Sequence, residues 1–273
     1  MPVIVHLSDL HFGAHLEALA ESLLTDVATR QPDLVVVSGD LTQRARPGEF
    51  EQAREFLDRM PGPVLTVVGN HDLPLFNLPK RLLSQTRRYE KYITADLDPV
   101  LLLPGVAVVG LDTMPAWRWK AGHVSPRQAR SVAESLCNSR REAWRILVTH
   151  HPVLPPRLSG LVGRDVLVDA CAQARVALLM SGHTHTASAE LVSLGVPGRQ
   201  HSALAVVAGT TISRRTRRTP NSYGVLRLSD EMDVGAKIML EVRQPLERHW
   251  SAAWTTHFEY ASEGVVARSP GKP

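Results

Sequence analysis

Short apolar runs of strand length recur through the first two-thirds of the sequence, and stretches with helical spacing of apolar residues separate them. Residues 3–7, 34–37 and 64–68 form the first three runs, with predicted helices at residues 16–29 and 49–60 between them. A regular alternation of strand and helix is typical of βαβ units. The pattern therefore predicts an α/β fold built on a largely parallel sheet.

The alternation continues along the chain and changes character near residue 187. A helical excursion is predicted at residues 74–92. Further elements follow, with strands expected at residues 106–111, 146–148 and 177–180, and helices at residues 125–140 and 166–174. Beyond residue 187, turn residues separate short apolar segments, which favours an antiparallel meander. Its strands are predicted at residues 203–207, 223–228 and 238–242.

A single domain is the expectation for this chain. Its 273 residues are 44% hydrophobic, which is enough to bury a full core. No linker rich in proline, glycine or serine divides the sequence. We therefore place one domain over residues 1–262 and expect residues 263–273 to be a disordered tail.

The cysteines and the N-terminus bear on the compartment. Cys137 and Cys171 lie in predicted helices and do not have metal-type C-x-x-C spacing, which suits buried thiols in a reducing compartment. The N-terminus lacks the pattern of a secretory signal, and no apolar run approaches the roughly 18 residues of a membrane helix. The sequence thus predicts a cytoplasmic protein without a transmembrane segment.

The charge is only mildly basic, with a formal net charge of +4 and a sequence pI of about 9.3. A nucleic-acid binder is expected to carry a dense stripe of lysine and arginine, which such a small surplus does not indicate. The charge is compatible with an anionic small-molecule substrate. The 12 histidines are more informative, because several of them follow predicted strands.

Five short polar motifs come directly after predicted strands. They are Asp9-Leu10-His11, Gly39-Asp40, Gly69-Asn70-His71-Asp72, Thr149-His150-His151-Pro152 and Gly182-His183-Thr184-His185. Each alone could be an ordinary turn or helix cap. Together they share one location, since α/β sheets place their ligands at the carboxyl ends of strands.

The donor types in these motifs narrow the chemistry. All are oxygen or imidazole donors and none is a thiolate, which suits Mn, Fe, Zn or Mg-like ions and argues against a closed structural zinc site. They are also too many for one ion. The sequence therefore predicts a metal centre with more than one cation.

The order of the five motifs, over residues 9–185, resembles the signature of the calcineurin-like metallophosphoesterase superfamily. For the fold, the resemblance implies a four-layer α/β/β/α sandwich of two mixed sheets flanked by helices. For the cofactors, it implies two divalent metal ions, Mn²⁺ and/or Fe, with Zn²⁺, Co²⁺ or Mg²⁺ as alternatives. The implied ligands are Asp9, His11 and His185 for one ion, Asn70, His150 and His183 for the other, and Asp40 as the bridge.

The same resemblance gives His71 a catalytic role beside Asp40 and Asn70. His71 would face the substrate and protonate the leaving group, a task that suits an imidazole pKa near 6.5. The alternative is a histidine that only orients Asp40 or Asn70. Asp72 is expected to steady the loop. The other histidines considered are given structural roles first, namely His6, His15, His123 and His151.

The substrate is less constrained than the reaction. Asp9-Leu10-His11-Phe12, Gly39-Asp40-Leu41-Thr42, Gly110-Leu111-Asp112-Thr113 and Pro220-Asn221-Ser222-Tyr223 resemble stretches of the bacterial class III cyclic-nucleotide phosphodiesterases. Glycerophosphodiesterases share the scaffold. So does the UDP-diacylglucosamine hydrolase of lipid A synthesis, whose commoner form is expected to carry arginine in place of His71. A DNA nuclease and a non-enzymatic scaffold are the remaining alternatives.

An arginine-rich run follows the predicted strand at residues 203–207. Such a run is usually a solvated loop, but arginines near the site could bind a phosphate with two hydrogen bonds. We count Arg214, Arg215, Arg217 and Arg218 as candidate substrate contacts. A small phosphodiester is the expected partner, nucleic acid is not, and a lipid-linked substrate and a homodimer stay open.

Overall fold

The computed structural model describes residues 1–74, 85–115, 121–155, 160–195, 201–217, 219–247 and 249–268. Within these residues, successive side chains of each buried strand face opposite sides of the sheet, as the two-residue period of a strand requires. In β1 (Val3–Leu7), Val3 and Val5 join one hydrophobic core, whereas Ile4 joins a second core on the other side. Strands buried on both faces explain the unbroken apolar runs of the sequence.

The first half of the sheet is parallel at one edge and antiparallel toward the middle. Its strands are β3 (Val64–Thr66), β2 (Leu34–Val37), β1, β10 (Tyr223–Leu228), β11 (Lys237–Leu246) and β12 (His249–Ala261), in spatial order. The three N-terminal strands pair in parallel, and the others pair antiparallel.

The second half of the sheet is also mixed. Its spatial order is β13 (Gly264–Ala267), β9 (His201–Val207), β7 (Leu178–Ser181), β6 (Trp144–Thr149), β5 (Val106–Leu111) and β4 (Val100–Leu103), with β8 (Ser188–Leu194) antiparallel to β9. The parallel pair of Gly264 and Ser202 joins the two halves into one network of 13 strands.

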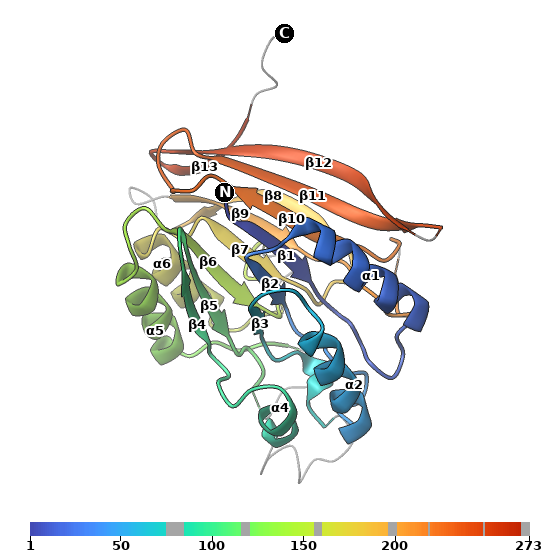
Figure 1. Ribbon diagram of the computed structural model, residues 1–273. Helices are drawn as coiled ribbons and strands as arrows, with labels where there is room; N and C mark the ends of the chain where they lie inside the picture. Colours follow the sequence, from blue (N-terminus) through green and yellow to red (C-terminus); the bar gives the residue numbers. More distant parts are fainter. Residues whose placement is uncertain are drawn as a thin grey trace.

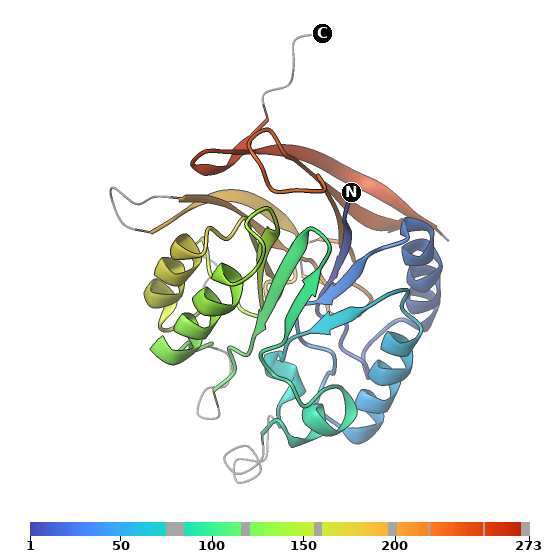
Figure 2. The same cartoon turned by 60° about the vertical axis from the view of Figure 1, so that its left-hand side comes forward.

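The two halves pack face to face, and helices cover both outer surfaces (Figure 1). Residues of both halves, such as Val36 and Val148, share the central core. The outer cores lie under the helices α1 (Glu17–Arg30) and α2 (Pro47–Asp58) on one side and α5 (Pro126–Cys137) and α6 (Arg164–Gln173) on the other. Figure 2 shows the same layers from a second direction. The α/β/β/α arrangement expected from the resemblance is confirmed.

Local sequence explains where α5 begins. The backbone N–H of Gln128 donates to the Ser125 hydroxyl at 3.2 Å, and the N–H of Ser125 donates to Oε1 of Gln128 at 3.1 Å. This reciprocal capping satisfies two donors that a helix start otherwise leaves unpaired, and Pro126 supplies a first residue that needs no donor. Among the described helices, none is long and apolar enough to cross a membrane.

Two expectations about the chain need correction, and a third falls partly outside the described residues. Gly264–Ala267 form β13 instead of belonging to a disordered tail, because they pair with β12 on one side and β9 on the other. The strand predicted at residues 203–207 is not simply part of an antiparallel meander, because β9 pairs in parallel with β7. Of the helical excursion at residues 74–92, the structure describes α4 (Arg87–Tyr92), and residues 75–84 lie outside the described residues.

Candidate metal centre

The candidate ligands come from loops that follow five strands of the two half-sheets. Asp9 and His11 follow β1, Asp40 follows β2, and Asn70 begins the short 3₁₀ helix η1 (Asn70–Asp72) after β3. On the other half-sheet, His150 follows β6, while His183 and His185 follow β7. All seven lie in the described part of the chain, and the structure brings them together.

The backbone of these loops is unusual. Positive φ angles, which residues other than glycine rarely adopt, occur at five candidate ligands: Asp9 (52°), His11 (48°), Asp40 (54°), His183 (68°) and His185 (63°). Such conformations are costly and persist where the surrounding structure enforces them, which is common at functional sites. The site therefore depends on a particular backbone conformation as well as on the donor atoms.

The glycines of the motifs leave room for the ligands. A Cβ atom on Gly39 would lie 2.6 Å from Nδ1 of His150. A Cβ on Gly69 would overlap the backbone nitrogen and carboxylate of Asp40, and one on Gly182 would overlap the Ser8 hydroxyl. Each of these glycines thus allows two ligand-bearing loops to approach closely.

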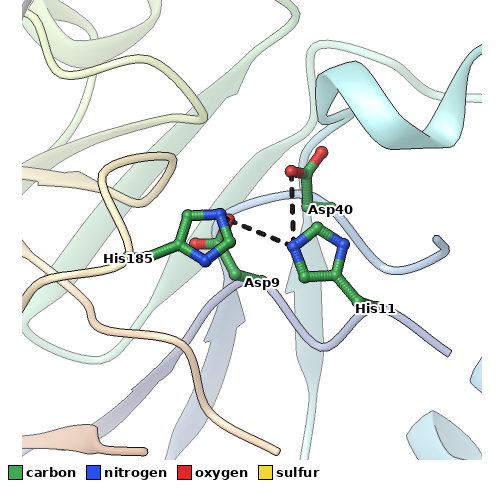
Figure 3. Close-up of side chains that lie close together, drawn as sticks. All are labelled: Asp9, His11, Asp40 and His185. Atoms are coloured by element: carbon green, nitrogen blue, oxygen red, sulfur yellow. Dashed lines mark ion pairs between the residues drawn. The ribbon is translucent and has the colours of Figure 1, made fainter. Parts of the chain in front are cut away.

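The first group of donors consists of Asp9, His11, Asp40 and His185, all buried. One donor atom from each lies within 4.8 Å of the others. Nε2 of His11 lies 3.8 Å from an oxygen of Asp9 and 3.8 Å from Oδ2 of Asp40, and Nε2 of His185 lies 3.4 Å from Oδ1 of Asp9. Figure 3 shows the His11 imidazole pointing toward both carboxylates.

The second group consists of Asn70, His150 and His183. Oδ1 of Asn70 lies 3.1 Å from Nε2 of His150 and 3.1 Å from Nδ1 of His183. The two ring nitrogens are 3.2 Å apart. Nε2 of His150 also lies 3.5 Å from Oδ1 of Asp40. Asp40 therefore faces the first group with one oxygen and the second group with the other.

Hydrogen bonds to backbone carbonyls fix which nitrogen of three imidazoles faces the centre. Nδ1 donates to Thr42 in His11 (3.3 Å), to Ser38 in His150 (2.8 Å) and to Arg215 in His185 (2.8 Å). Nδ1 must carry the proton in such a bond, so Nε2 keeps its lone pair for a metal. His183 differs, because it turns Nδ1 toward Asn70.

The pKa values of the buried carboxylates and imidazoles suit a site that binds cations. Burial raises the pKa of Asp9 and of Asp40 to about 7, and proximity of the two carboxylates adds to the rise at Asp9. Burial lowers the pKa of His150 to about 3 and also lowers the pKa of His11, which leaves neutral imidazoles. Oδ1 of Asp9 and Nε2 of His11 are buried without a hydrogen-bond partner. Buried lone-pair atoms without a partner are costly unless a cation binds them, so the residues fit a metal centre.

His71 lies beside the first donor group but belongs to neither of the two groups. Its Nδ1 donates to the Gln43 carbonyl at 2.8 Å, and its ring meets that of His11 edge-on at 4.9 Å between centroids. Nη1 of Arg215 donates to Nε2 of His71 at 3.1 Å. Burial, followed by the nearby Arg215 cation, lowers the pKa of His71 despite the bond to Gln43.

Asp72 connects two of the ligand loops, in line with the role expected for it. Its carboxylate accepts from the backbone N–H groups of Leu41, Thr42 and Gly69 at 3.2, 2.8 and 2.9 Å. Sequence reasoning did not assign a role to Thr42. Its carbonyl orients His11, and its hydroxyl donates to the carbonyl of His71 at 3.1 Å. The sequence signal for Thr42 is its place two residues after Asp40, in the stretch Gly39-Asp40-Leu41-Thr42.

The arginine run is partly described. Residues 214–217 have exposed side chains, and Arg218 lies outside the described residues. Arg215 contacts His71, as given above, and Arg217 lies close enough to His183 to contribute to the lowering of its pKa, after burial and the neighbouring imidazoles. The backbone N–H of Arg214 donates to the Ala14 carbonyl at 3.0 Å.

The four histidines that were given structural roles from the sequence lie outside the two donor groups. His6 bonds the Ser38 hydroxyl at 3.0 Å, and His15 forms an ion pair with Glu17 at 3.0 Å. His151 contacts the Thr113 hydroxyl at 2.8 Å, and its ring packs on His183 at 4.6 Å between centroids. The last of them, His123, forms a backbone bridge with residue 162.

Comparisons with known proteins find relatives that are similar to this chain in sequence or in fold. A probable cyclic nucleotide phosphodiesterase from Synechococcus sp. is 25% identical over 202 residues, which are 67% of this chain and 73% of that protein. A glycerophosphodiester phosphodiesterase from Enterobacter lignolyticus is 35% identical over 81 residues, 26% of this chain and 29% of that protein. A purple acid phosphatase from yellow lupin (Lupinus luteus) seeds shares the fold with a TM-score of 0.66 at 12% identity, over 99% of this chain and 57% of that chain.

A sequence model of a known family also matches, over residues 2–187. That range contains all five motifs and both donor groups, and it is well over half of the chain. The family is described as calcineurin-like phosphoesterase. The chain therefore belongs to the calcineurin-like phosphoesterase family.

Proposed function

We propose that this chain is a dinuclear-metal phosphodiesterase that acts on a small phosphodiester, with a cyclic nucleotide as the first candidate. One observation carries the proposal above all others. Asp40 lies between two sets of donors, with Oδ2 3.8 Å from Nε2 of His11 and Oδ1 3.5 Å from Nε2 of His150. A carboxylate in that place suits a bridge between two cations.

The donor sets suggest how two metals are held. Asp9, His11 and His185 would bind one ion and Asn70, His150 and His183 the other, with Asp40 shared. The mixture of imidazole and oxygen donors suits Mn²⁺, Fe or Zn²⁺. Two such cations, when bound, polarise the phosphoryl oxygens and lower the pKa of bound water, which supports in-line hydrolysis.

His71 is proposed to serve the leaving group. Its Nδ1 is held by the Gln43 carbonyl, so Nε2 is the atom that can give a proton to the departing oxygen. In the neutral ring Nε2 accepts from Arg215, so the acid form arises when Nε2 takes up a proton from solvent. Substrate oxygen would take the place of that guanidinium contact at Nε2.

The names of the relatives support a diester over a monoester. The Synechococcus protein is described as a probable cyclic nucleotide phosphodiesterase, and the Enterobacter protein as a glycerophosphodiester phosphodiesterase. Family membership makes this chain a metal-dependent phosphoester hydrolase. Its substrate among the phosphodiesters is part of our proposal.

A turnover screen of Mn²⁺-loaded protein tests the proposal. The substrates are cAMP, bis(4-nitrophenyl) phosphate, glycerophosphodiesters, UDP-diacylglucosamine and single-stranded DNA, with Asp40→Ala protein as the blank. We expect hydrolysis of cAMP or another small diester, abolished by chelation and restored by metal. Absence of turnover with every small diester would contradict the proposal, while turnover of only UDP-diacylglucosamine or only DNA would favour one of those two alternatives.

A further inference from the structure

The turn at residues 213–215 is anchored to the metal centre. The backbone N–H of Arg214 donates to the Ala14 carbonyl, and the Ser213 carbonyl accepts from the Asn221 side chain at 2.9 Å. The Arg215 carbonyl accepts from Nδ1 of His185. Ser213 itself is buried. These contacts fix the turn beside two ligand loops, so the side chains it carries start from a defined position.

The Arg215 guanidinium extends from this turn to His71 and Gln43. Nη1 lies 3.1 Å from Nε2 of His71 and 3.3 Å from Oε1 of Gln43, both neutral acceptors. Among the described residues, no carboxylate forms an ion pair with Arg215 or Arg217. A guanidinium has five donors in a planar fork, so most of those of Arg215 remain for a ligand.

The charge of the site indicates what that ligand is. Two divalent cations against the three buried carboxylates Asp9, Asp40 and Asp72 leave one surplus positive charge, which the single negative charge of a phosphodiester balances. Arg215 beside His71 and Arg217 on the side of His183 add to this surplus. Their positive charge is complementary to a second anionic group outside the reacting phosphate.

We propose that Arg215, assisted by Arg217, binds a second phosphate of the substrate, so that the preferred substrates are phosphodiesters that carry an additional phosphate group. This inference rests on the proposed phosphodiesterase function and narrows its substrate class, because diesters with a further phosphate are then preferred to a cyclic nucleotide such as cAMP, which carries none. A phosphate oxygen pair accepts two parallel hydrogen bonds from one guanidinium, a geometry that lysine does not offer. Arg215 is therefore a specificity-determining residue.

The test uses two substrates that differ by one phosphate. Thymidine 5′-(4-nitrophenyl phosphate) and its 3′-phosphorylated form release the same nitrophenolate, so the leaving group is constant. We expect metal-loaded protein to cleave the 3′-phosphorylated form with the higher kcat/KM. Arg215→Ala should reduce that advantage roughly 10- to 100-fold, the range of a charged hydrogen-bond pair, mainly through KM. Arg215→Lys should restore only part of it.

A binding measurement complements the kinetics. By titration calorimetry, adenosine 3′,5′-bisphosphate should bind metal-loaded wild-type protein more tightly than AMP, and Arg215→Ala should bring the two dissociation constants together. Arg141→Ala is the matched control, because it removes the same charge from an exposed position. Arg141 precedes β6, whereas the candidate ligand His150 follows that strand. It should retain both preferences.

The outcomes separate this inference from the proposed function. Failure to cleave either thymidine diester would count against the phosphodiesterase itself. If both diesters are cleaved and Arg215→Ala slows them equally, Arg215 serves the reacting phosphate and the inference is wrong. Absence of a preference for the extra phosphate in both the kinetic and the calorimetric pair would overturn it as well.

Discussion

Nδ1 of His185 donates a hydrogen bond of 2.8 Å to the backbone carbonyl of Arg215. The bond selects the tautomer of a candidate ligand, and it also fixes the turn whose side chain contacts His71. Because a main-chain oxygen provides the contact, substitution of the Arg215 side chain should leave His185 oriented. Side-chain variants at residue 215 can thus examine substrate recognition while the ligand geometry is kept.

Asp40→Ala should remove metal from both halves of the centre. Wild-type protein is expected to hold about two divalent ions per chain, since two-metal sites of this kind share a carboxylate. Elemental analysis of the variant should find clearly less than one ion, with hydrolysis lost. Asp165→Ala is the control, because its exposed carboxylate lies on α6 and forms an ion pair with the neighbouring Arg164. Full activity of Asp40→Ala, or of chelated wild-type protein, would rule out the two-metal account.

Gly69→Ala should weaken metal binding without unfolding the chain. The added methyl group would overlap the backbone nitrogen and carboxylate of Asp40, so that loop has to shift. A displacement of this kind should lower metal affinity by about 10- to 100-fold, as loss of a ligand-orienting contact does. Gly48→Ala in α2 is the matched variant, since nothing lies within 4 Å of its added methyl group.

Gly48→Ala should instead stabilise the protein slightly, by about 0.5–1 kcal/mol, because alanine loses less backbone entropy in a helix. Metal titration and thermal unfolding of the two variants provide the comparison. Equal metal affinity in Gly69→Ala and Gly48→Ala would mean that the loop of Asp40 tolerates the methyl group and that close packing at Gly69 is unimportant.

His71→Ala should lower kcat in a way that depends on the leaving group. General acid help is typically worth about 10²–10⁴-fold, so a sugar-alkoxide leaving group should show a loss of that order. Nitrophenolate departs readily without a proton, and its loss should be clearly smaller. Metal content should remain near that of the wild type. Equal losses on both substrates would assign His71 to charge stabilisation or positioning, and loss of metal would make it a ligand or its support.

His201 should make the protein less stable in acid. Burial lowers the pKa of His201 from 6.5 to about 4, and Nε2 bonds the Val176 carbonyl at 3.1 Å. Between these two pH values the unfolded chain takes up a proton that the folded chain does not. The free energy of unfolding therefore falls as pH decreases from 6.5 toward 4, by on the order of 3 kcal/mol at most.

The matched variant is His201→Gln, which keeps a side-chain donor near Val176 but does not titrate. Its unfolding free energy, measured by denaturant titration at several pH values, should depend less on pH in that window. Parallel curves for the two proteins would show that protonation of His201 does not couple to folding.

Sequence patterning identified the elements that are buried on both faces. The bounds predicted for β1, β2, β5 and β10 agree with the structure, because their residues are apolar on both sides. β4, β8, β12 and β13 were not predicted. β4 is an apolar run of four residues, VLLL, that is only partly buried and was not assigned, whereas β12 presents many small or polar side chains and does not stand out as an apolar run.

For the site, the sequence indicated which residues share one end of the strands but not how they are held there. The positive φ angles at Asp9 and Asp40 follow from packing that no short motif encodes. The bond from His150 to the Ser38 carbonyl spans 112 residues of sequence, and that from His185 to Arg215 spans 30. Contacts to backbone carbonyls leave no trace in residue identity, which is why these partners were missed.

The join at Gly264 and Ser202 has a consequence for the order in which the molecule can be built. The last candidate ligand, His185, comes before both strands that connect the two half-sheets, β9 and β13, in the sequence. All the candidate metal ligands are therefore translated before the strands that hold the two halves together. Each donor group draws on both half-sheets, so metal that reaches the nascent chain early would meet incomplete sets of ligands, and the paired centre would form only once the C-terminal strands emerge.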